Sequence, residues 1–414
     1  MGAFPAYLLL YVVLYGGWGV LSPFLPAVLA ERGATAEQIG VLLALGIAAR
    51  LLSMPLAGAL TDRLGAPRAV LAALLLAGAA SGLGYGLVPV GSAALLLAVG
   101  VVQHAATGPL GPLPDALAVR AAARPRGSGG FDYGVVRGAG AAAFIAGAAL
   151  AGRAVEEAGV AVVVLGLNAG LFALAAGALL LLPRPPAGAA PPRPGVRREA
   201  EAAPATGRTR ALLAIPAFRR LLLVSALVSG SHAFYTGFAT LRWQAAGIEA
   251  DAIGLLWSVS VASEVAVFFL LGRPLLARLG PGGLLALAAG AGALRWSVMA
   301  ATAWAPAMFL VQPLHGLTFA AQHLAAMAVI ARVVPGSAAA TAQSAYAVFG
   351  TGAAMAALTL ASGPLYGRFG GGGYWAMALL CAAAVPVALA LRVGGAEPFE
   401  EGRGGDGGRR AGPG

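Results

Sequence analysis

Residues 58–68 read GALTDRLGAPR and join two long apolar runs, 36–60 and 68–90. Each run has the length of about 20 residues that an α-helix needs to cross the hydrocarbon core of a bilayer. The stretch 58–68 is short and carries one aspartate and two arginines. The pattern predicts two membrane-spanning helices joined by a short charged loop.

The rest of the chain repeats this pattern. Of its 414 residues, 59% are hydrophobic and only 10% are charged, and the mean hydropathy is +0.83. One soluble core could not bury so much apolar surface, so we expect lipid to cover the remainder. The sequence therefore predicts an all-α membrane protein with twelve transmembrane helices. The predicted helices are 6–30, 36–60, 68–90, 92–118, 131–152, 158–183, 217–241, 250–276, 281–302, 305–333, 338–366 and 372–393.

Arginine is distributed unevenly between the predicted loops. All 27 basic residues are arginines, of which 20 fall on the side that holds both termini, four fall on the other side, and Arg50, Arg137 and Arg295 lie inside apolar runs. Because positively charged loops stay on the cytoplasmic side, we expect a multi-pass protein of a bacterial inner membrane with both termini in the cytoplasm. The first apolar run lacks the features of a cleaved signal peptide and is expected to be retained. The net charge of +11 is then better explained by contact with anionic lipid headgroups than by nucleic acid.

The predicted helices divide into two sets of six. Residues 184–215 are rich in Pro, Ala and Arg and have no apolar periodicity, which predicts a flexible cytoplasmic linker. The linker separates an N-terminal six-helix bundle, 1–183, from a C-terminal one, 216–394. Residues 395–414 are rich in Gly and Arg and predict a disordered cytoplasmic tail.

Short sequence echoes relate the two halves. Gly40 recurs as Gly254 at an offset of 214 residues, and Gly152 recurs as Gly367 at an offset of 215. Echoes at nearly one offset predict two parallel, pseudo-symmetric repeats. In transporters built from such repeats, the substrate binds between them near the middle of the membrane.

The segment 58–68 resembles the G-x-L-x-D-R-x-G-R-[KR] motif of the major facilitator superfamily, although Ala66 and Pro67 depart from its basic positions. Glycines permit a tight turn and close helix approach, and an aspartate near a helix end can hold basic residues in one conformation and release them in another. A plain salt bridge within the loop is the alternative. The residues to which the resemblance assigns a gating role are Gly58, Asp62, Arg63, Gly65 and Arg68.

Further segments resemble the phenylpropionate permease family, a branch related to the lactose permease-type proton symporters. The similarity covers the chain apart from the linker and the tail. It implies a transporter of two six-helix bundles that imports an aromatic carboxylate with protons. The segments are FDYGVVRG at 131–138, RWQAAG at 242–247, EV at 264–265, LRW at 294–296 and HLAAM at 323–327.

Three polar residues lie near the middles of consecutive predicted helices, where each is costly unless it faces a partner or a wet cavity. These are Glu264, Arg295 and His315, and their layout resembles the coupling site of lactose permease. Thr318 stands where the resemblance would place a further glutamate, which leaves Glu264 as the candidate proton carrier. A buried carboxyl group holds its proton more tightly in dry surroundings and less tightly beside an arginine, so a movement of Arg295 would switch it. A static Glu264–Arg295 clamp is the alternative.

The N-terminal half offers Asp115 and Arg137 as a corresponding acid and arginine. Arg50 has no acidic residue one helical turn away. Counting Arg295 and Glu264 as well, three interior arginines face two carboxylates, which favours an anionic substrate that a guanidinium can bind through two hydrogen bonds. The alternative for Arg50 is an arginine that is capped by carbonyl groups or paired with Asp115.

Other polar and aromatic side chains recur at helical spacing on faces of the predicted helices. Aromatic rings beside arginines would suit an aromatic acid, although packing is the alternative for each of these residues. The further candidate substrate contacts are His104, His232, Tyr235, Trp18, Trp257, Gln312 and Gln322.

Several other chemistries are excluded by what the sequence lacks. It contains no lysine, which rules out a Walker A loop and a Schiff base, and its one cysteine, Cys381, has no partner for a disulfide or a thiolate metal site. No metal, cofactor or enzymatic activity is expected. The sequence predicts a proton-coupled importer of a small organic acid that works as a monomer. Alternatives are a sugar or nucleoside proton symporter, a drug–proton antiporter and a transporter-like sensor.

Overall fold

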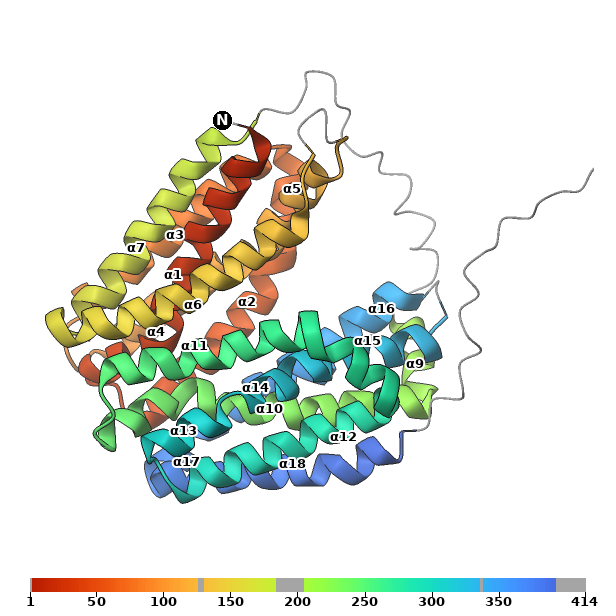
Figure 1. Cartoon of the computed structure of the whole chain (residues 1–414). Coiled ribbons are helices and arrows are strands. Elements are labelled where there is room, and N and C mark those ends of the chain that lie inside the picture. Colours follow the sequence, from red (N-terminus) through yellow and green to blue (C-terminus); the bar gives the residue numbers. More distant parts are fainter. Residues whose placement is uncertain (1, 126–129, 184–204, 336–337, 392–414) are drawn as a thin grey trace, which may run out of the picture.

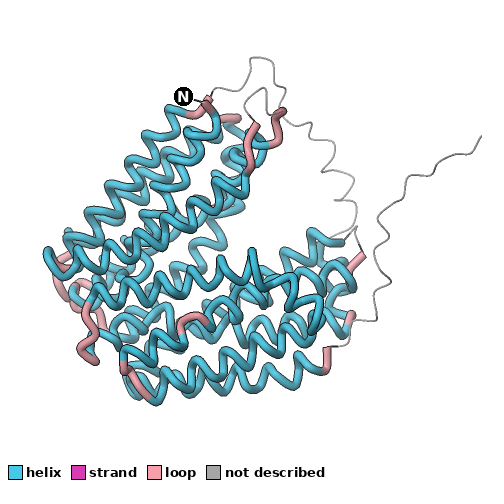
Figure 2. The backbone as a smooth tube through the Cα atoms, in the orientation of Figure 1, coloured by secondary structure: helices cyan, strands magenta, loops and turns pink. Residues whose placement is uncertain are grey.

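The computed structural model describes residues 2–125, 130–183, 205–335 and 338–391. Within these ranges the chain is helical and forms no strand. The helices gather into two bundles that lie close together at one end and diverge towards the other (Figures 1 and 2). We call these the convergent end and the divergent end.

The first bundle contains the helices that precede residue 183. They are α1 (Ala3–Glu31), α2 (Ala36–Leu64), α3 (Pro67–Leu87), α4 (Ala93–Thr107), η1 (Gly108–Leu110), α5 (Pro112–Ala122), α6 (Tyr133–Ala158), α7 (Val160–Ala178) and η3 (Leu179–Leu181).

The second bundle contains the helices that follow residue 205. They are α9 (Ala205–Ala214), α10 (Pro216–Ala245), α11 (Ala250–Ala266), η5 (Val267–Leu271), α12 (Gly272–Ala301), α13 (Ala305–Val311), α14 (Leu314–Gly316), η6 (Leu317–Ala321), α15 (Gln322–Val333), α16 (Ala339–Ala345), η8 (Tyr346–Gly352), α17 (Ala353–Phe369), η9 (Gly370–Gly373) and α18 (Tyr374–Leu389).

The described residues form ten helical stretches that are long and apolar enough to cross a membrane. Two of these, Ala250–Ala301 and Ala339–Leu389, are long enough for two crossings each. The first stretch is broken at Gly280, whose φ of 66° is a conformation that residues other than glycine rarely adopt. The second stretch is broken by the turn η9. The structure therefore contains the twelve crossings that the sequence predicts, with most boundaries within a few residues.

Two features of helix formation follow directly from the sequence. Thr35 and Gln38 form a capping box that begins α2, and Gly65 ends α2 in the left-handed conformation. Pro109 and Pro112 interrupt the fourth crossing, where the 3₁₀ turn η1 separates α4 from α5.

The expectation for residues 184–215 needs a correction. Residues 184–204 lie outside the described ranges, as does the expected tail at 395–414, but residues 205–214 form the helix α9 rather than a flexible segment. Leu212 is buried, and α9 packs against α10 and α16. Burial of this apolar residue stabilises a helix that the local sequence alone did not suggest.

The second bundle has a densely packed interior that includes the single cysteine. Cys381 on α18 is fully buried, and its thiol lies 3.3 Å from the hydroxyl group of Ser231 on α10. The same hydroxyl accepts a hydrogen bond from the indole nitrogen of Trp296 at 2.8 Å. This network joins α10, α12 and α18 beside the polar residues described below.

Candidate functional site

Glu264, His315 and Arg295 form a continuous hydrogen-bonded chain inside the second bundle, which we call the Glu264 cluster. Nε2 of His315 lies 2.9 Å from Oε1 of Glu264, and Nδ1 of His315 lies 2.9 Å from Nη1 of Arg295. Glu264 stands on α11 just before the π-helical segment η5, and His315 stands on α14 just before the π-helical segment η6. Such segments often accompany functional sites because they shift side chains out of regular helical register.

The partners of His315 define where its hydrogen lies. A guanidinium group only donates hydrogen bonds, so Nδ1 of His315 must accept from Arg295. In the neutral ring Nε2 then carries the hydrogen and donates it to Glu264. A second proton on Nδ1 would face the guanidinium at 2.9 Å and break the chain. A proton added to the free Oε2 atom of Glu264 would leave the chain intact.

Arg295 is fully enclosed by protein. Its guanidinium lies 4.4 Å from the ring centroid of Tyr235 and 4.5 Å from that of Trp296. Nη2 donates to the side-chain oxygen of Gln312 at 2.5 Å, and this oxygen also accepts from Ser260 at 2.9 Å. Because Arg295 is fully buried and two of its nitrogens are bonded, it is not accessible to a ligand in this conformation.

The other candidate contacts of the second bundle are also buried. His232 bonds to the carbonyl of Val228 at 2.9 Å and to Thr318 at 3.0 Å, so Thr318 contacts a histidine at the position where the family motif has a glutamate. Trp257 donates to Thr240 at 3.2 Å, and Gln322 donates to Ser229 at 2.9 Å. The predicted residues Tyr235, His232 and Gln312 lie around the Glu264 cluster, but all of them are buried and contact other residues of the same bundle.

A pocket of about 260 Å³ lies between the two bundles. We call it the interbundle pocket. Its walls come from α1, α2 and α4 of the first bundle and from α10 and α17 of the second. It contains three of the predicted substrate contacts, Trp18, Arg50 and His104, beside an apolar wall. The apolar lining residues are Leu21, Leu25, Leu43, Ile47 and Met355.

Arg50 is the charged residue of this pocket. The only hydrogen bond of its guanidinium group among the described residues is a long one, 3.4 Å from Nη2 to the hydroxyl group of Thr107. It is neither capped by carbonyl groups nor paired with Asp115, and its side chain is exposed. His104 beside it bonds through Nδ1 to the carbonyl of Gly100 at 2.8 Å, which leaves Nε2 as a hydrogen-bond acceptor in the neutral ring. The pocket thus offers an unpaired guanidinium next to apolar and aromatic surface.

Asp115 and Arg137, the acid and arginine predicted for the first bundle, do not contact each other. Asp115 accepts a hydrogen bond of 2.5 Å from the hydroxyl group of Tyr11, and the guanidinium of Arg137 lies 4.6 Å above the ring of Tyr15. The sequence prediction missed these contacts. Their signal was the spacing of Tyr11 and Tyr15, which places both rings on one face of the first helix.

The convergent end is held together by two close helix crossings. Gly254 of α11 lies against the backbone of Ala148 on α6, where a side chain at residue 254 would overlap the carbonyl oxygen. Gly40 of α2 packs in the same way on Gly363 of α17, whose Cα would lie 3.0 Å from a Cβ at residue 40. The echo between Gly40 and Gly254 therefore marks equivalent crossings between the bundles. A hydrogen bond of 2.8 Å from Ser258 to the carbonyl of Ile145 extends the first crossing.

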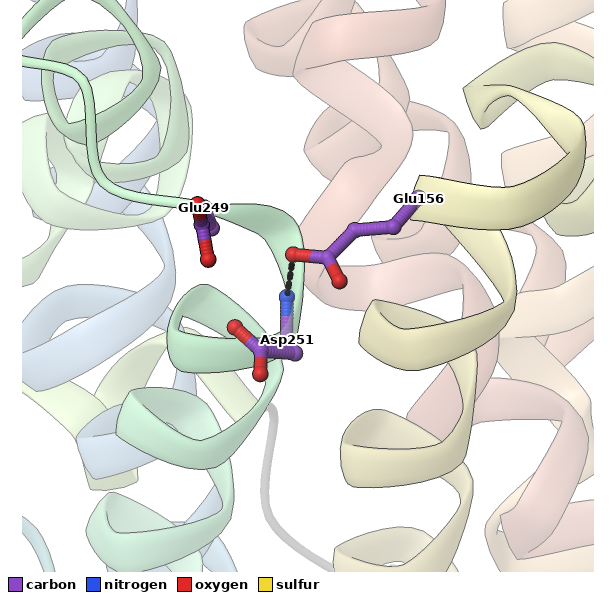
Figure 3. A group of neighbouring side chains, drawn as sticks. All are labelled: Glu156, Glu249 and Asp251. Atoms are coloured by element: carbon purple, nitrogen blue, oxygen red, sulfur yellow. Dashed lines mark hydrogen bonds between the residues drawn. The ribbon is translucent and has the colours of Figure 1, made fainter.

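Three carboxylates meet beyond the first crossing, as Figure 3 shows. One oxygen of Glu156 on α6 accepts a hydrogen bond of 3.2 Å from the backbone nitrogen of Asp251 in the first turn of α11. Carboxylate oxygens of Glu156, Glu249 and Asp251 lie within 4.8 Å of one another. Glu156 and Glu249 are exposed, so we interpret the cluster as a solvated contact between the bundles.

The predicted gating motif lies at the divergent end. Asp62 and Arg63 are exposed, and no hydrogen bond or ion pair joins the side chain of Asp62 to another residue in the described part of the chain. Arg68 instead donates to the carbonyl oxygens of Leu182, at 2.9 Å, and Pro183. Arg68 therefore fixes the end of the sixth crossing, and the loop salt bridge that the sequence allowed does not form.

Comparisons with known proteins identify relatives among membrane transporters. A family model described as the MFS_1 like family matches residues 6–377. The probable 3-phenylpropionic acid transporter of Escherichia coli (strain K12) is 35% identical over 373 residues, which cover 89% of this chain and 93% of that protein.

Solved structures show the same fold. The crystal structure of the nucleoside transporter NupG superposes with a TM-score of 0.73 at 18% identity and covers 94% of this chain and 98% of that one. A bacterial homolog of the human lysosomal transporter Spinster, in an inward-facing and unoccupied conformation, superposes with a TM-score of 0.63 at 16% identity over 94% of this chain and 96% of that one.

Proposed function

The chain belongs to the MFS_1 like family and is a multi-pass membrane transporter, and from this premise we propose that it imports an aromatic carboxylate together with protons by alternating access. The relative named for 3-phenylpropionic acid supports this substrate class. The interbundle pocket supports it independently, because an unpaired arginine and an indole ring suit a carboxylate and an aromatic ring.

The Glu264 cluster is the observation that carries proton coupling. A carboxylate deep in a membrane protein is costly unless it has a task or a partner. Among the described residues His315 bonds to one oxygen of Glu264, Arg295 bonds to His315, and the second oxygen of Glu264 has no partner. We infer that Glu264 takes up and releases the coupled proton, and that His315 and Arg295 position it.

The distribution of arginine supports an orientation. Among the described residues, four arginines lie at the convergent end, Arg32, Arg153, Arg242 and Arg368, and ten lie at the divergent end. The ten are Arg63, Arg68, Arg120, Arg124, Arg210, Arg219, Arg220, Arg273, Arg278 and Arg332. By the positive-inside rule the divergent end faces the cytoplasm of a bacterial cell, with both termini on that side. The conformation described here is then inward-facing.

The division of the chain supports a rocking movement. Residues 1–183 and 216–394 would move as two units about the convergent end, joined by the cytoplasmic linker 184–215. One chain supplies all walls of the interbundle pocket, so we propose that the transporter works as a monomer.

Vesicle uptake tests this function. The purified protein is reconstituted, and an inward proton gradient is imposed in the presence of labelled 3-phenylpropionate. We expect uptake above that of protein-free vesicles, which record the passive entry of the uncharged acid. A sugar, a nucleoside and a cationic drug serve as competing substrates. Gradient-driven uptake of one of these without uptake of the aromatic acid would overturn the proposal.

A further inference from the structure

Arg50 and Glu264 occupy equivalent positions in the two halves of the transporter. Both lie on the second crossing of their bundle, at the same offset of 214 residues that relates Gly40 to Gly254. Each follows its glycine by ten residues, or about 15 Å along a helix. Because both glycines lie at crossings of the convergent end, the two charged groups stand at one depth on opposite bundles.

The two positions carry opposite charges and have opposite surroundings. Arg50 is exposed in the interbundle pocket, and among the described residues its guanidinium bonds only weakly, to Thr107. Glu264 is bonded through one oxygen to His315 and keeps the other oxygen free. One repeat therefore presents a fixed positive charge at the depth where the other presents a group that can gain or lose a proton.

The remaining interior arginines are less suited to the substrate carboxylate. Arg295 is fully buried and bonded to His315 and Gln312. The guanidinium of Arg137 lies 4.6 Å above the ring of Tyr15, and Arg137 does not line the interbundle pocket. Arg50 is the interior arginine that lines the interbundle pocket.

Of the titratable and charged groups around Glu264, only Glu264 itself can take up the coupled proton. His315 from α14 and Arg295 from α12 contact Glu264 or each other, and His232 and Tyr235 from α10 lie behind them. The hydrogen-bond pattern fixes His315 in its neutral form, since its Nδ1 accepts from Arg295. From the facing bundle Arg137 contributes a positive charge.

The groups around Arg50 do not add a second proton site. Nδ1 of His104 donates to a backbone carbonyl, and a second proton on its ring would stand beside the guanidinium of Arg50. Tyr85 is buried, and a phenol keeps its proton at neutral pH. Asp115 lies elsewhere in the first bundle and is held by Tyr11.

We propose that Arg50 binds the substrate carboxylate and that Glu264 binds the one coupled proton, so that each cycle moves one carboxylate and one proton and no net charge. The substrate enters as R–COO⁻ and the proton enters separately, and both leave on the other side without a covalent change. The electroneutral stoichiometry rests on the proposed function, since it requires proton-coupled import of a carboxylate.

The stoichiometry is tested in vesicles under two separate driving forces. A pH gradient at zero membrane potential should accelerate the uptake of 3-phenylpropionate. A potassium diffusion potential set by valinomycin, with equal pH on both sides, should leave the rate unchanged in either polarity. Accumulation should level off at about tenfold per pH unit, the limit for one proton per singly charged acid. Uptake that responds to the potential, or accumulation beyond this limit, would overturn the electroneutral proposal while leaving proton coupling in place. No response to either driving force would instead reject the proposed function.

The binding site is tested with purified variants and two probes that differ only in charge, 3-phenylpropionate and its amide. Arg50→Gln should weaken binding of the carboxylate by at least about tenfold and change binding of the amide little, because a charged hydrogen bond in a pocket is lost. Arg120→Gln is the matched control, since it removes an exposed arginine of α5. Retained amide binding shows that Arg50→Gln is folded; if that variant does not fold, Arg50→Lys serves in its place and should weaken carboxylate binding without abolishing it. Equal effects on the two probes, or unchanged carboxylate binding, would overturn the assignment.

Discussion

The hydroxyl group of Tyr11 lies 2.5 Å from a carboxylate oxygen of Asp115. This bond ties the first crossing to α5, the segment that follows the break in the fourth crossing. Asp115 therefore has a partner within its own bundle and does not line the interbundle pocket. This contact favours a structural role for Asp115 over the substrate contact that the sequence suggested.

Tyr11→Phe should lower stability and leave substrate affinity nearly unchanged. The variant removes a hydrogen bond to a charged group, which costs about 1.5–3 kcal/mol of unfolding free energy at most sites. Thermal unfolding in detergent would measure the loss, and Tyr7→Phe, whose hydroxyl makes a longer bond of 3.2 Å to the carbonyl of Leu117, is the matched control. A large drop in affinity with unchanged stability would return Asp115 to the binding site.

Glu264→Gln should separate exchange from accumulation. Glutamine resembles the protonated carboxyl group permanently, so the variant should still bind substrate and exchange it across the membrane. It should no longer accumulate substrate against a gradient. Counterflow and gradient-driven uptake in the same vesicles measure the two activities. Accumulation by the variant would move the proton site elsewhere, whereas loss of both activities would favour a structural clamp.

Substrate affinity should depend on pH in one direction. Rising pH removes the proton from Glu264 and adds a negative charge to a cavity that must accept an anion, so affinity should fall as pH rises. Glu264→Gln should flatten this dependence. Binding of 3-phenylpropionate to the purified protein, measured above the pH range in which the ligand itself titrates, gives both curves. A variant that keeps the wild-type slope would contradict the assignment.

Asp62→Asn should slow transport without loosening the substrate. Asp62 is exposed and unpaired in the conformation described here, as expected for a loop that forms its ion pairs only in the opposite conformation. Its charge should matter for the transition between conformations, so the transport rate should fall while affinity stays within a few-fold. Initial rates in vesicles and equilibrium binding separate the two effects. Normal turnover would show that this charge is dispensable.

Gly254→Ala should weaken the convergent end. A methyl group at this position overlaps the backbone of Ala148, so α6 and α11 must separate at a cost of about 1–3 kcal/mol. Backbone amides at the start of α11 should exchange hydrogen faster with deuterated water. Gly290→Ala on α12 is the control, because a Cβ atom there meets nothing within 4 Å. Equal exchange in both variants would contradict the prediction, because the crossing would then tolerate the added methyl group.

The helices and their number could be predicted from sequence because a bilayer imposes one length and one composition on every crossing. The contact among Glu264, His315 and Arg295 was foreseeable in outline, since three costly residues at one depth tend to meet. Which of them touches which was not, because hydrogen-bond partners depend on rotamers and helix rotation. Arg137 and Asp115 show the limit most clearly: their charges suggested a pair, yet each found an aromatic partner on α1.

The burial of Cys381 makes this chain well suited to spectroscopic labelling. Its thiol is enclosed between α10 and α18, and the chain has no second cysteine and no lysine. Cysteines introduced in place of the exposed Glu156 and Glu249 would therefore carry paired spin labels with little background. The distribution of distances between the two labels would show what fraction of molecules has the bundles parted at this end, as substrate and proton are added in turn.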